Sequence, residues 1–293
     1  MTYNIAFIGY GSIAKRHLSN LVTVSRENKF EISVDIFRLN VKKNDLIHEV
    51  DNVFALDTVD KIEKSYDFVF ITSPTHTHYK YLMIFKNYSQ RIFIEKPVFH
   101  KSNLLAYNYK FLENKYIYVA CPLRYLEGFR YLKKYLKNKS VFSARAISSS
   151  YLPDWRNQSD YRKNYSAFAE YGGGVDLDLI HEWDYLISLF GFPTEIKSYK
   201  EKYSNLEINS NDIAIYIAKY HNMAIEIHLD YFGRVPIRKL EIFTDTDTIT
   251  YNFLKDEIEF LNEGKILQFK NDGNQHYLNE MRYFISNSIR INN

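Results

Sequence analysis

The chain has 293 residues, of which 46% are apolar and 25% are charged, and its 38 Lys and Arg against 35 Asp and Glu leave a formal net charge of +3. These proportions exclude a disordered or fibrous chain, and the balance of charge argues against a nucleic-acid binder that works through phosphate contacts. Because single hydrophobic cores stop growing at about 250–300 residues, the length predicts two domains.

The start of the chain, MTYNIAFIGYGS, lacks the basic region, long apolar run and cleavage site of a signal peptide. No run reaches the ~18 apolar residues of a membrane helix. Cys121 is the single cysteine, which excludes an intramolecular disulfide and a cysteine-based zinc site. We therefore expect a cytoplasmic protein with no metal, no nucleic-acid partner and no membrane partner.

Strands and helices are predicted to alternate in the first part of the chain. Apolar runs predict strands, and segments with helical spacing between them predict helices. The strands are expected over 3–8, 30–37, 51–55, 66–72, 91–94 and 116–120, and the helices over 12–22 and 79–85. This order predicts an α/β domain with a parallel sheet over residues 1–120, ended by Pro122.

The order of predicted strands and helices changes in residues 121–293, which we assign to a second domain. Helices are expected over 125–136, 175–190 and 277–289, and strands over 140–150, 195–203, 212–220, 223–231, 240–244 and 248–253. Most of these strands follow one another without long helices between them. This pattern predicts an α+β domain with a mostly antiparallel sheet.

A glycine turn between the first predicted strand and helix matches the GxGxxG/A pattern of dinucleotide-binding proteins. It reads Gly9-Tyr10-Gly11-Ser12-Ile13-Ala14. The first glycine permits a tight turn, and the second lets a pyrophosphate approach the backbone. The amides and dipole of the helix N-terminus favour a phosphate there. The turn predicts a dinucleotide site that includes Gly9, Gly11, Ser12 and Ile13.

The end of the second predicted strand selects between NAD and NADP. An acid there accepts from the ribose hydroxyls of NAD, whereas an arginine suits the 2′-phosphate of NADP. If the strand runs through Phe37, Arg38 takes this position; if it ends early, Asp35 takes it. If Arg38 only stacks on the adenine ring, it would not distinguish NADP from NAD. We expect NADP or NAD and favour NADP.

Several further motifs follow in chain order. Together with the glycine turn they resemble the Gfo/Idh/MocA oxidoreductases, relatives of glucose–fructose oxidoreductase and inositol dehydrogenase, over essentially the whole chain. The motifs are Thr72-Ser73-Pro74-Thr75-His76-Thr77-His78, Glu95-Lys96-Pro97, Leu123-Arg124-Tyr125, Gly172-Gly173-Gly174 and His181-Glu182-Trp183-Asp184.

The resemblance implies a Rossmann domain followed by an α+β domain whose open sheet carries the substrate pocket and often an oligomer interface. It also implies a nicotinamide dinucleotide, reversible hydride transfer at a sugar-like carbinol, and a homo-oligomer, either a dimer or a tetramer. The residues expected to bind the cofactor are Gly9, Gly11, Ser12, Ile13, Arg38, Thr72, Ser73, Pro74, His78, Glu95 and Lys96.

The resemblance implies that Lys96 lies near the nicotinamide and the reacting hydroxyl, beside a cis Pro97. Oxidising an alcohol removes a hydride and a proton, so the site needs a base and a cation that steadies the oxygen charge. His181 suits the base, since histidine titrates near pH 6.5. Lys96 suits the cation. The alternatives without a catalytic role are that Lys96 is a surface lysine and that His181 is a histidine of the core.

One departure from the family pattern concerns an aspartate near this histidine. The family places an Asp four residues before the His, where this chain has Leu177, and its own Asp178 lies three before. Because residues three and four apart share a helix face, we keep Asp178 as a third catalytic candidate. Asp176 is expected to point elsewhere, and Glu182 and Asp184 to be structural.

The polar and aromatic segment from Tyr151 to Ser166 is expected to be a loop that approaches substrate. Trp155 would stack, and Arg156 or Arg162 would meet a carboxylate or phosphate. The alternative without a role in binding is a solvent-exposed loop whose tryptophan packs against the protein. The residues expected to bind substrate are Arg124, Trp155, Arg156, Tyr161 and Arg162.

Within the family, this loop and the motifs after it resemble the branch found with bacterial surface-polysaccharide and nonulosonic-acid sugars. An acidic sugar would suit Arg124, Arg156, Arg162 and Arg238. Two other functions stay open on the same fold. One is an inactive dinucleotide-binding sensor or scaffold, and the other is a reductase of a non-sugar such as a linear tetrapyrrole.

Overall fold

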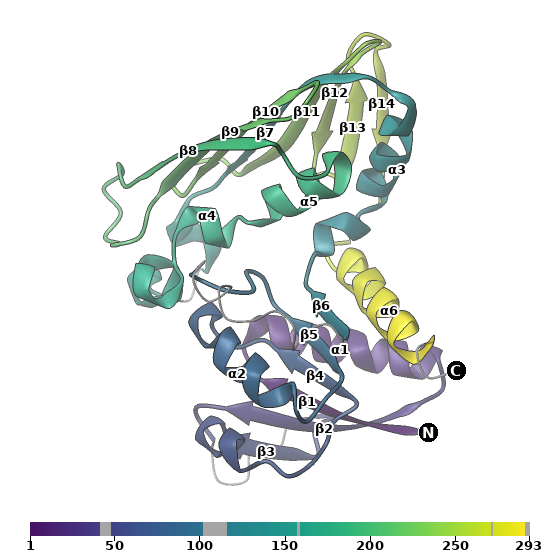
Figure 1. The fold of residues 1–293 in the computed structure, drawn as a ribbon, viewed down its shortest axis with the longest axis vertical. Coiled ribbons are helices and arrows are strands. Elements are labelled where there is room, and N and C mark those ends of the chain that lie inside the picture. Colours follow the sequence, from purple (N-terminus) through teal and green to yellow (C-terminus); the bar gives the residue numbers. More distant parts are fainter. Residues whose placement is uncertain (42–47, 102–115, 157–158, 271, 291–293) are drawn as a thin grey trace. The chain divides into compact units, whose positions relative to one another are not determined.

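The computed structural model describes residues 1–41, 48–101, 116–156, 159–270 and 272–290. Within them the chain divides into two units, drawn in Figure 1. The first consists of Met1–Ala120 and the segment that begins at Tyr277, and the second of Cys121–His276.

A six-stranded parallel sheet forms the centre of the first unit, as predicted. Its strand order is β3-β2-β1-β4-β5-β6. The strands are β1 (Thr2–Ile8), β2 (Glu31–Arg38), β3 (Asn52–Ala55), β4 (Phe68–Ile71), β5 (Arg91–Ile94) and β6 (Tyr116–Val119). All residues of β4 and β5 are buried, because helices cover both faces of such a sheet.

Helix α1 (Ser12–Glu27) and helix α6 (Gln275–Arg290) share one hydrophobic core with the sheet, and helix α2 (His78–Phe85) belongs to the core on the other side. Phe284 of α6 packs edge-on against Phe68, Phe70 and Phe93, with ring centroids 5.3–5.7 Å apart. The assignment of residues 277–293 to the second domain is therefore wrong. The helical spacing predicts α6 itself, but it does not identify the sheet on which α6 packs.

An eight-stranded, mostly antiparallel sheet forms the second unit, also as predicted. Its order is β14-β13-β12-β11-β7-β10-β9-β8, and β7 and β10 are its parallel pair. The strands are β7 (Val141–Ser149), β8 (Glu195–Glu201), β9 (Ile213–Lys219), β10 (Ala224–Asp230), β11 (Ile237–Thr244), β12 (Thr248–Asn252), β13 (Glu257–Phe260) and β14 (Lys265–Gln268).

Helices α3 (Glu127–Tyr135), α4 (Val175–Asp178) and α5 (His181–Phe190) lie on one face of this sheet (Figure 1). Phe129, Leu132, Tyr185 and Leu186 from α3 and α5 join the strands in one core. Residues 175–190 form two helices rather than one, since Leu179 ends α4 in a non-helical conformation. None of the described helices is long and apolar enough to cross a membrane.

Candidate functional site

The carboxyl ends of β1, β2, β4 and β5 lie at one edge of the first sheet, because these strands are parallel. The order of the strands reverses between β1 and β4, which is where open α/β sheets bind ligands. The glycine turn, Arg38, the Thr72–His78 segment and Lys96 all come at these strand ends. The predicted cofactor residues of the first unit therefore gather at one edge.

Gly9 and Gly11 are glycines for different reasons. Gly9 has a φ of +87°, and a Cβ there would lie 2.7 Å from the Cα of Ser73. Its amide donates to the carbonyl of Phe37 at 2.8 Å, and its carbonyl accepts from Thr72 Oγ1 at 2.8 Å. A Cβ on Gly11 would meet no atom of the described residues within 4 Å, apart from its two chain neighbours. The protein itself thus requires Gly9, whereas Gly11 leaves open space at the N-terminus of α1.

The end of β2 presents Arg38 and not Asp35. Arg38 is the last residue of the strand, and its positive charge acts on Tyr10 of the glycine turn. Burial raises the pKa of the Tyr10 phenol, and the charge of Arg38 partly opposes this rise. Asp35 is only 1% exposed. Its carboxylate accepts from Asn52, Lys64 and Tyr66 at 2.8–3.0 Å. Asp35 is therefore unsuited to bind a ribose.

His78 joins the Thr72–His78 segment to the turn after β5. Its two ring nitrogens lie 2.8 Å from the carbonyl oxygen of Ser73 and 3.0 Å from that of Pro97. Burial lowers the pKa of His78, and the two carbonyls only partly offset this effect. Since the ring is buried between two loops, His78 holds Ser73 and Pro97 in place.

Glu95 supports Lys96 from inside the unit. Its Oε1 lies 2.6 Å from Nε2 of His17 on α1, and its Oε2 accepts from the Lys96 amide at 3.3 Å. Burial alone would raise the pKa of Glu95, but the hydrogen bond and charge of His17, with the charge of Lys96, hold it below its usual value. The Lys96–Pro97 peptide is cis, as the resemblance implies. Glu95 and the turn therefore fix the backbone that carries Lys96.

Asp178, at the end of α4, is a buried carboxylate between two tyrosines. Tyr231 donates to its Oδ2 at 2.6 Å. Burial, and then the charge and hydrogen bond of Asp178, raise the pKa of Tyr165. Asp176 pairs instead with Lys200 at 2.6 Å, so it does point elsewhere. His181 begins α5 three residues after Asp178.

The described residues between Tyr151 and Ser166 include three short 3-10 turns, which begin at Leu152, Tyr161 and Tyr165. The ring of Trp155 packs edge-on against Tyr231, with centroids 5.3 Å apart. Arg156 lies over the ring of Tyr165 and donates to Asn164 at 3.1 Å. Trp155 and Arg156 therefore gather around Asp178, within the same unit.

Three of the arginines expected to meet an acidic substrate bind carboxylates of their own unit instead. The guanidinium of Arg124 forms a two-armed pair with Asp184 at 2.6 and 2.9 Å. Arg162 pairs with Asp160 and Glu207, both at 2.9 Å, and Arg238 pairs with the buried Glu182 at 3.0 Å. The prediction that Arg124 and Arg162 bind substrate overlooked these acids, which lie 2 to 60 positions away along the chain.

Tyr231, which donates a hydrogen bond to Asp178, is not identified by any motif in the sequence. It follows a β-strand and reads as one more aromatic among 26 tyrosines. Tyr161, predicted to bind substrate, accepts a hydrogen bond at its hydroxyl from the Glu207 amide and lines a pocket of the second unit.

Comparisons with known proteins agree with this architecture. Residues 3–139 match the model of an oxidoreductase family with an NAD-binding Rossmann fold. Three similar solved structures are a levoglucosan dehydrogenase with NADH and L-sorbose, UDP-N-acetylglucosamine 3-dehydrogenase GnnA from Acidithiobacillus ferrooxidans, and a myo-inositol 2-dehydrogenase from Lactobacillus plantarum.

The TM-scores of these structures are 0.80, 0.77 and 0.75, and their identities 14%, 14% and 17%. The matches cover 98%, 100% and 99% of this chain and 90% of each of the other chains. A sequence search of curated proteins gave no match. At these identities the structures establish a shared fold along the whole chain.

Proposed function

We propose that the protein is a nicotinamide-dependent sugar oxidoreductase of the Gfo/Idh/MocA family, a proposal supported by the match of residues 3–139 to the model of an oxidoreductase family with an NAD-binding Rossmann fold. It would transfer a hydride between the nicotinamide and a carbinol or keto group of a sugar or an acidic sugar derivative. The levoglucosan, myo-inositol and UDP-N-acetylglucosamine dehydrogenases that share the fold act on polyhydroxylated rings, which supports this class of substrate.

The observation that carries the proposal is the open space at Gly11. A dinucleotide needs close backbone approach at the second glycine of the turn and free amides at a helix N-terminus. Both features are present here, because no described residue beyond the two chain neighbours lies within 4 Å of a Cβ on Gly11, and α1 begins at Ser12. Gly11, Ser12 and Ile13 would hold the pyrophosphate, and Arg38 the adenosine ribose.

Arg38→Ala is expected to reduce the preference for NADP over NAD by about tenfold or more, because charge-assisted hydrogen bonds to a 2′-phosphate contribute roughly 1.5–3 kcal/mol. Calorimetric titration with each dinucleotide measures the ratio of the two affinities. Arg26→Ala, which removes an exposed arginine of α1, serves as the control. An unchanged ratio in Arg38→Ala would remove Arg38 as the selector.

Bound nicotinamide supplies the chemistry of hydride acceptance or donation. The chain must then manage the proton and the charge on the reacting oxygen. We assign to His181 the role of the base that takes the proton of the reacting hydroxyl. We assign to Lys96 the role of the cation that stabilises the negative charge on the reacting oxygen. The roles fit their settings, since Lys96 follows a buried strand and is fixed by Glu95 and a cis proline, and His181 begins α5.

We assign Asp178 to positioning. Its carboxylate is buried and accepts from Tyr231, and Tyr165 and Trp155 complete the surroundings. A carboxylate held by two phenols can fix the substrate loop without exchanging a proton with the substrate.

Asp178→Asn is expected to lower kcat by a smaller factor than loss of a positioned acid–base group, which costs about 10²–10⁴-fold. An amide keeps the shape of the carboxylate but weakens its hydrogen bonds to the tyrosines. Steady-state kinetics against the substrate identified below give the factor, and Asp176→Asn is the matched control. A loss as large as that of His181→Ala would make Asp178 part of the proton path.

We further propose a role in bacterial surface-glycan sugar metabolism and a homo-oligomer, either a dimer or a tetramer. Both follow from the family resemblance. The face of the second sheet opposite α3 and α5 would supply the interface, since no described helix of that unit covers it (Figure 1).

The proposal is tested by incubating the protein with NADP⁺ or NAD⁺ and a panel of neutral and acidic sugars, and following the absorbance of reduced nicotinamide. The reverse direction is followed with the reduced dinucleotides and keto sugars. Substrate-dependent reduction or oxidation supports the proposal. Binding of a dinucleotide without turnover of any sugar would favour an inactive dinucleotide-binding sensor. Turnover of a non-sugar substrate alone would favour a reductase of non-sugar compounds.

A further inference from the structure

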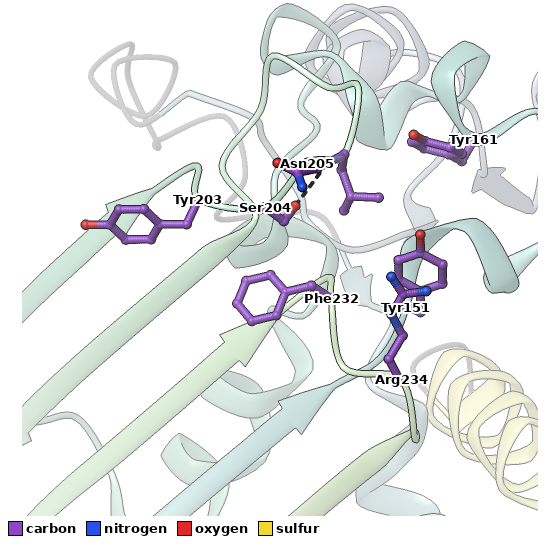
Figure 2. A pocket seen from close by; sticks show the side chains of 8 residues that line it. Tyr151, Tyr161, Tyr203, Ser204, Asn205, Phe232 and Arg234 are labelled. Carbon is purple, nitrogen blue, oxygen red and sulfur yellow. Dashed lines mark hydrogen bonds between the residues drawn. The ribbon is translucent and has the colours of Figure 1, made fainter.

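A pocket of about 420 Å³ lies in the second unit, at the edge of the sheet where β7, β10 and β8 end. Four aromatic residues line it, namely Tyr151, Tyr161, Tyr203 and Phe232, and Figure 2 shows the side chain of Arg234 beside that of Tyr151. The lining includes no acidic side chain. Small-molecule sites in proteins have volumes of about 300–1,000 Å³, so the space suits one sugar-sized ligand and not a polymer.

Two buried carboxylates shape the walls of this pocket from behind. Asp212 accepts from the amides of Tyr203 and Ser204 at 2.8 Å. Asp230 accepts from the amides of Phe232 and Gly233 at 3.1 and 2.9 Å. Because these acids accept from backbone amides of the two loops, the loops are held in shape, and the two carboxylates lie behind the pocket wall and not in its lining.

Arg234 is oriented by the loop and by one aromatic ring. A Cβ on the preceding Gly233 would lie 1.9 Å from Oγ of Ser149, so only glycine allows this close turn. The guanidinium then lies 3.7 Å from the centroid of the Tyr151 ring, as Figure 2 shows. Stacking of this kind restrains an arginine while leaving its N–H groups free to donate at the edge.

Arg234 also differs from four other arginines of the unit, because those four form ion pairs with carboxylates. Arg124, Arg162 and Arg238 pair with carboxylates, as described above, and Arg145 pairs with Glu226. Among the described residues, no carboxylate lies within ion-pairing distance of Arg234. The pocket therefore carries the positive charge of Arg234 beside aromatic side chains, with no carboxylate of the described residues in direct contact with it.

We propose that this pocket binds the anionic end of a sugar ligand, with its carboxylate or phosphate on Arg234 and its ring against Tyr151 and Phe232. Arginine matches both oxyanions through two parallel N–H donors. Aromatic faces suit the apolar face of a ring, and the tyrosine hydroxyls suit its polar edge. The inference rests on the proposed function, whose substrate class it narrows to acidic sugars.

The pocket shares two backbone segments with the residues around Asp178. Tyr231, which donates to Asp178, directly precedes Phe232, and its carbonyl accepts from the Leu152 amide, next to Tyr151. A ligand held at Arg234 would therefore extend from the same two segments that surround Asp178. This contiguity assigns the pocket to one part of the substrate and not to an unrelated effector.

The test measures the affinity of four probes by calorimetry, namely glucuronate, glucose 6-phosphate, UDP and neutral glucose, for the wild-type chain and two variants. Arg234→Gln removes the charge in the pocket. Arg130→Gln removes an exposed arginine of α3 that also pairs with no carboxylate of the described residues. We expect at least one anionic probe to bind more tightly than glucose, with about tenfold or greater loss in Arg234→Gln and none in Arg130→Gln.

A carboxylate source is indicated by glucuronate binding, and a phosphate source by glucose 6-phosphate or UDP binding. The proposal is overturned if no anionic probe binds, if Arg234→Gln binds as tightly as the wild type, or if Arg130→Gln loses as much. The same preparations are titrated with NADP⁺ and NAD⁺. Dinucleotide binding without anion binding refutes this pocket alone, whereas anion binding without dinucleotide binding refutes the proposed oxidoreductase alone.

Discussion

Lys96→Ala and His181→Ala are each expected to lower kcat by about 10²-fold or more, because positioned acid–base groups contribute about 10²–10⁴-fold. In Lys96→Ala the oxygen loses its cation, so the hydroxyl is harder to deprotonate. In His181→Ala the proton has no acceptor near neutral pH. The affinity for the dinucleotide should stay close to that of the wild type in His181→Ala, since His181 lies in the other unit from the glycine turn.

These effects are measured by steady-state kinetics with the sugar found in the panel, from about pH 6 to about pH 9, where histidine changes its charge. Lys101→Ala and His221→Ala, at exposed positions of the two units, are the matched controls. A wild-type rate in His181→Ala across this range would show that His181 is not the base. Tyr165, beside Asp178, would then be the next candidate.

Gly11→Val is expected to weaken binding of both dinucleotides by about 100-fold or more while leaving the fold stable. The new Cβ would meet no atom of the described residues within 4 Å beyond its chain neighbours, so we expect the fold to tolerate it. It would occupy the path along which a pyrophosphate approaches the backbone. Calorimetric affinity and thermal unfolding of the same variant separate the two effects.

Gly9→Val is the contrasting variant of the same turn. Here the side chain would meet the backbone of Ser73 and force a φ of +87° on a β-branched residue, so the unfolding temperature should fall. If Gly11→Val bound NADP and NAD as the wild type does, the dinucleotide assignment of this turn would be wrong. If Gly11→Val unfolded like Gly9→Val, the open space at Gly11 would not exist in solution.

The architecture of both units follows from the pattern of apolar runs in this chain. Strands buried on both faces and strands that alternate have different periodicities, so the parallel and the antiparallel sheet were both predictable. The hairpin of β13 and β14 was not predicted, since each strand has only four residues. The placement of α6 depends on Phe284 meeting three phenylalanines of distant strands, which no local pattern records.

The cofactor side of the site was predictable to a greater extent than the substrate side. Gly9, Gly11 and Lys96 follow strand ends, and parallel strands bring such ends together. The choice between Asp35 and Arg38 needed the structure, because Lys64 and Tyr66 come from a separate segment to bury Asp35.

On the substrate side, the sequence did not reveal which arginines are paired with acids of the same chain. Arg124 and Arg162 looked available in the sequence, and their acidic partners become apparent only when the chain is folded. Arg234, by contrast, had no motif around it. Its significance comes from the ring of Tyr151, which lies 83 positions earlier, and from the lack of an acidic side chain in the described lining of the pocket.

Calorimetric titration of the wild-type chain with NADP⁺ and with NAD⁺ tests the central claim most directly. We expect saturable binding of at least one of them at one site per chain, with a Kd below about 1 mM. Thermal unfolding in the presence of the dinucleotide should then move to higher temperature, because a ligand that binds only the folded state stabilises it. A folded chain that binds neither dinucleotide, and whose unfolding temperature neither of them raises, would contradict its assignment as a nicotinamide-dependent oxidoreductase.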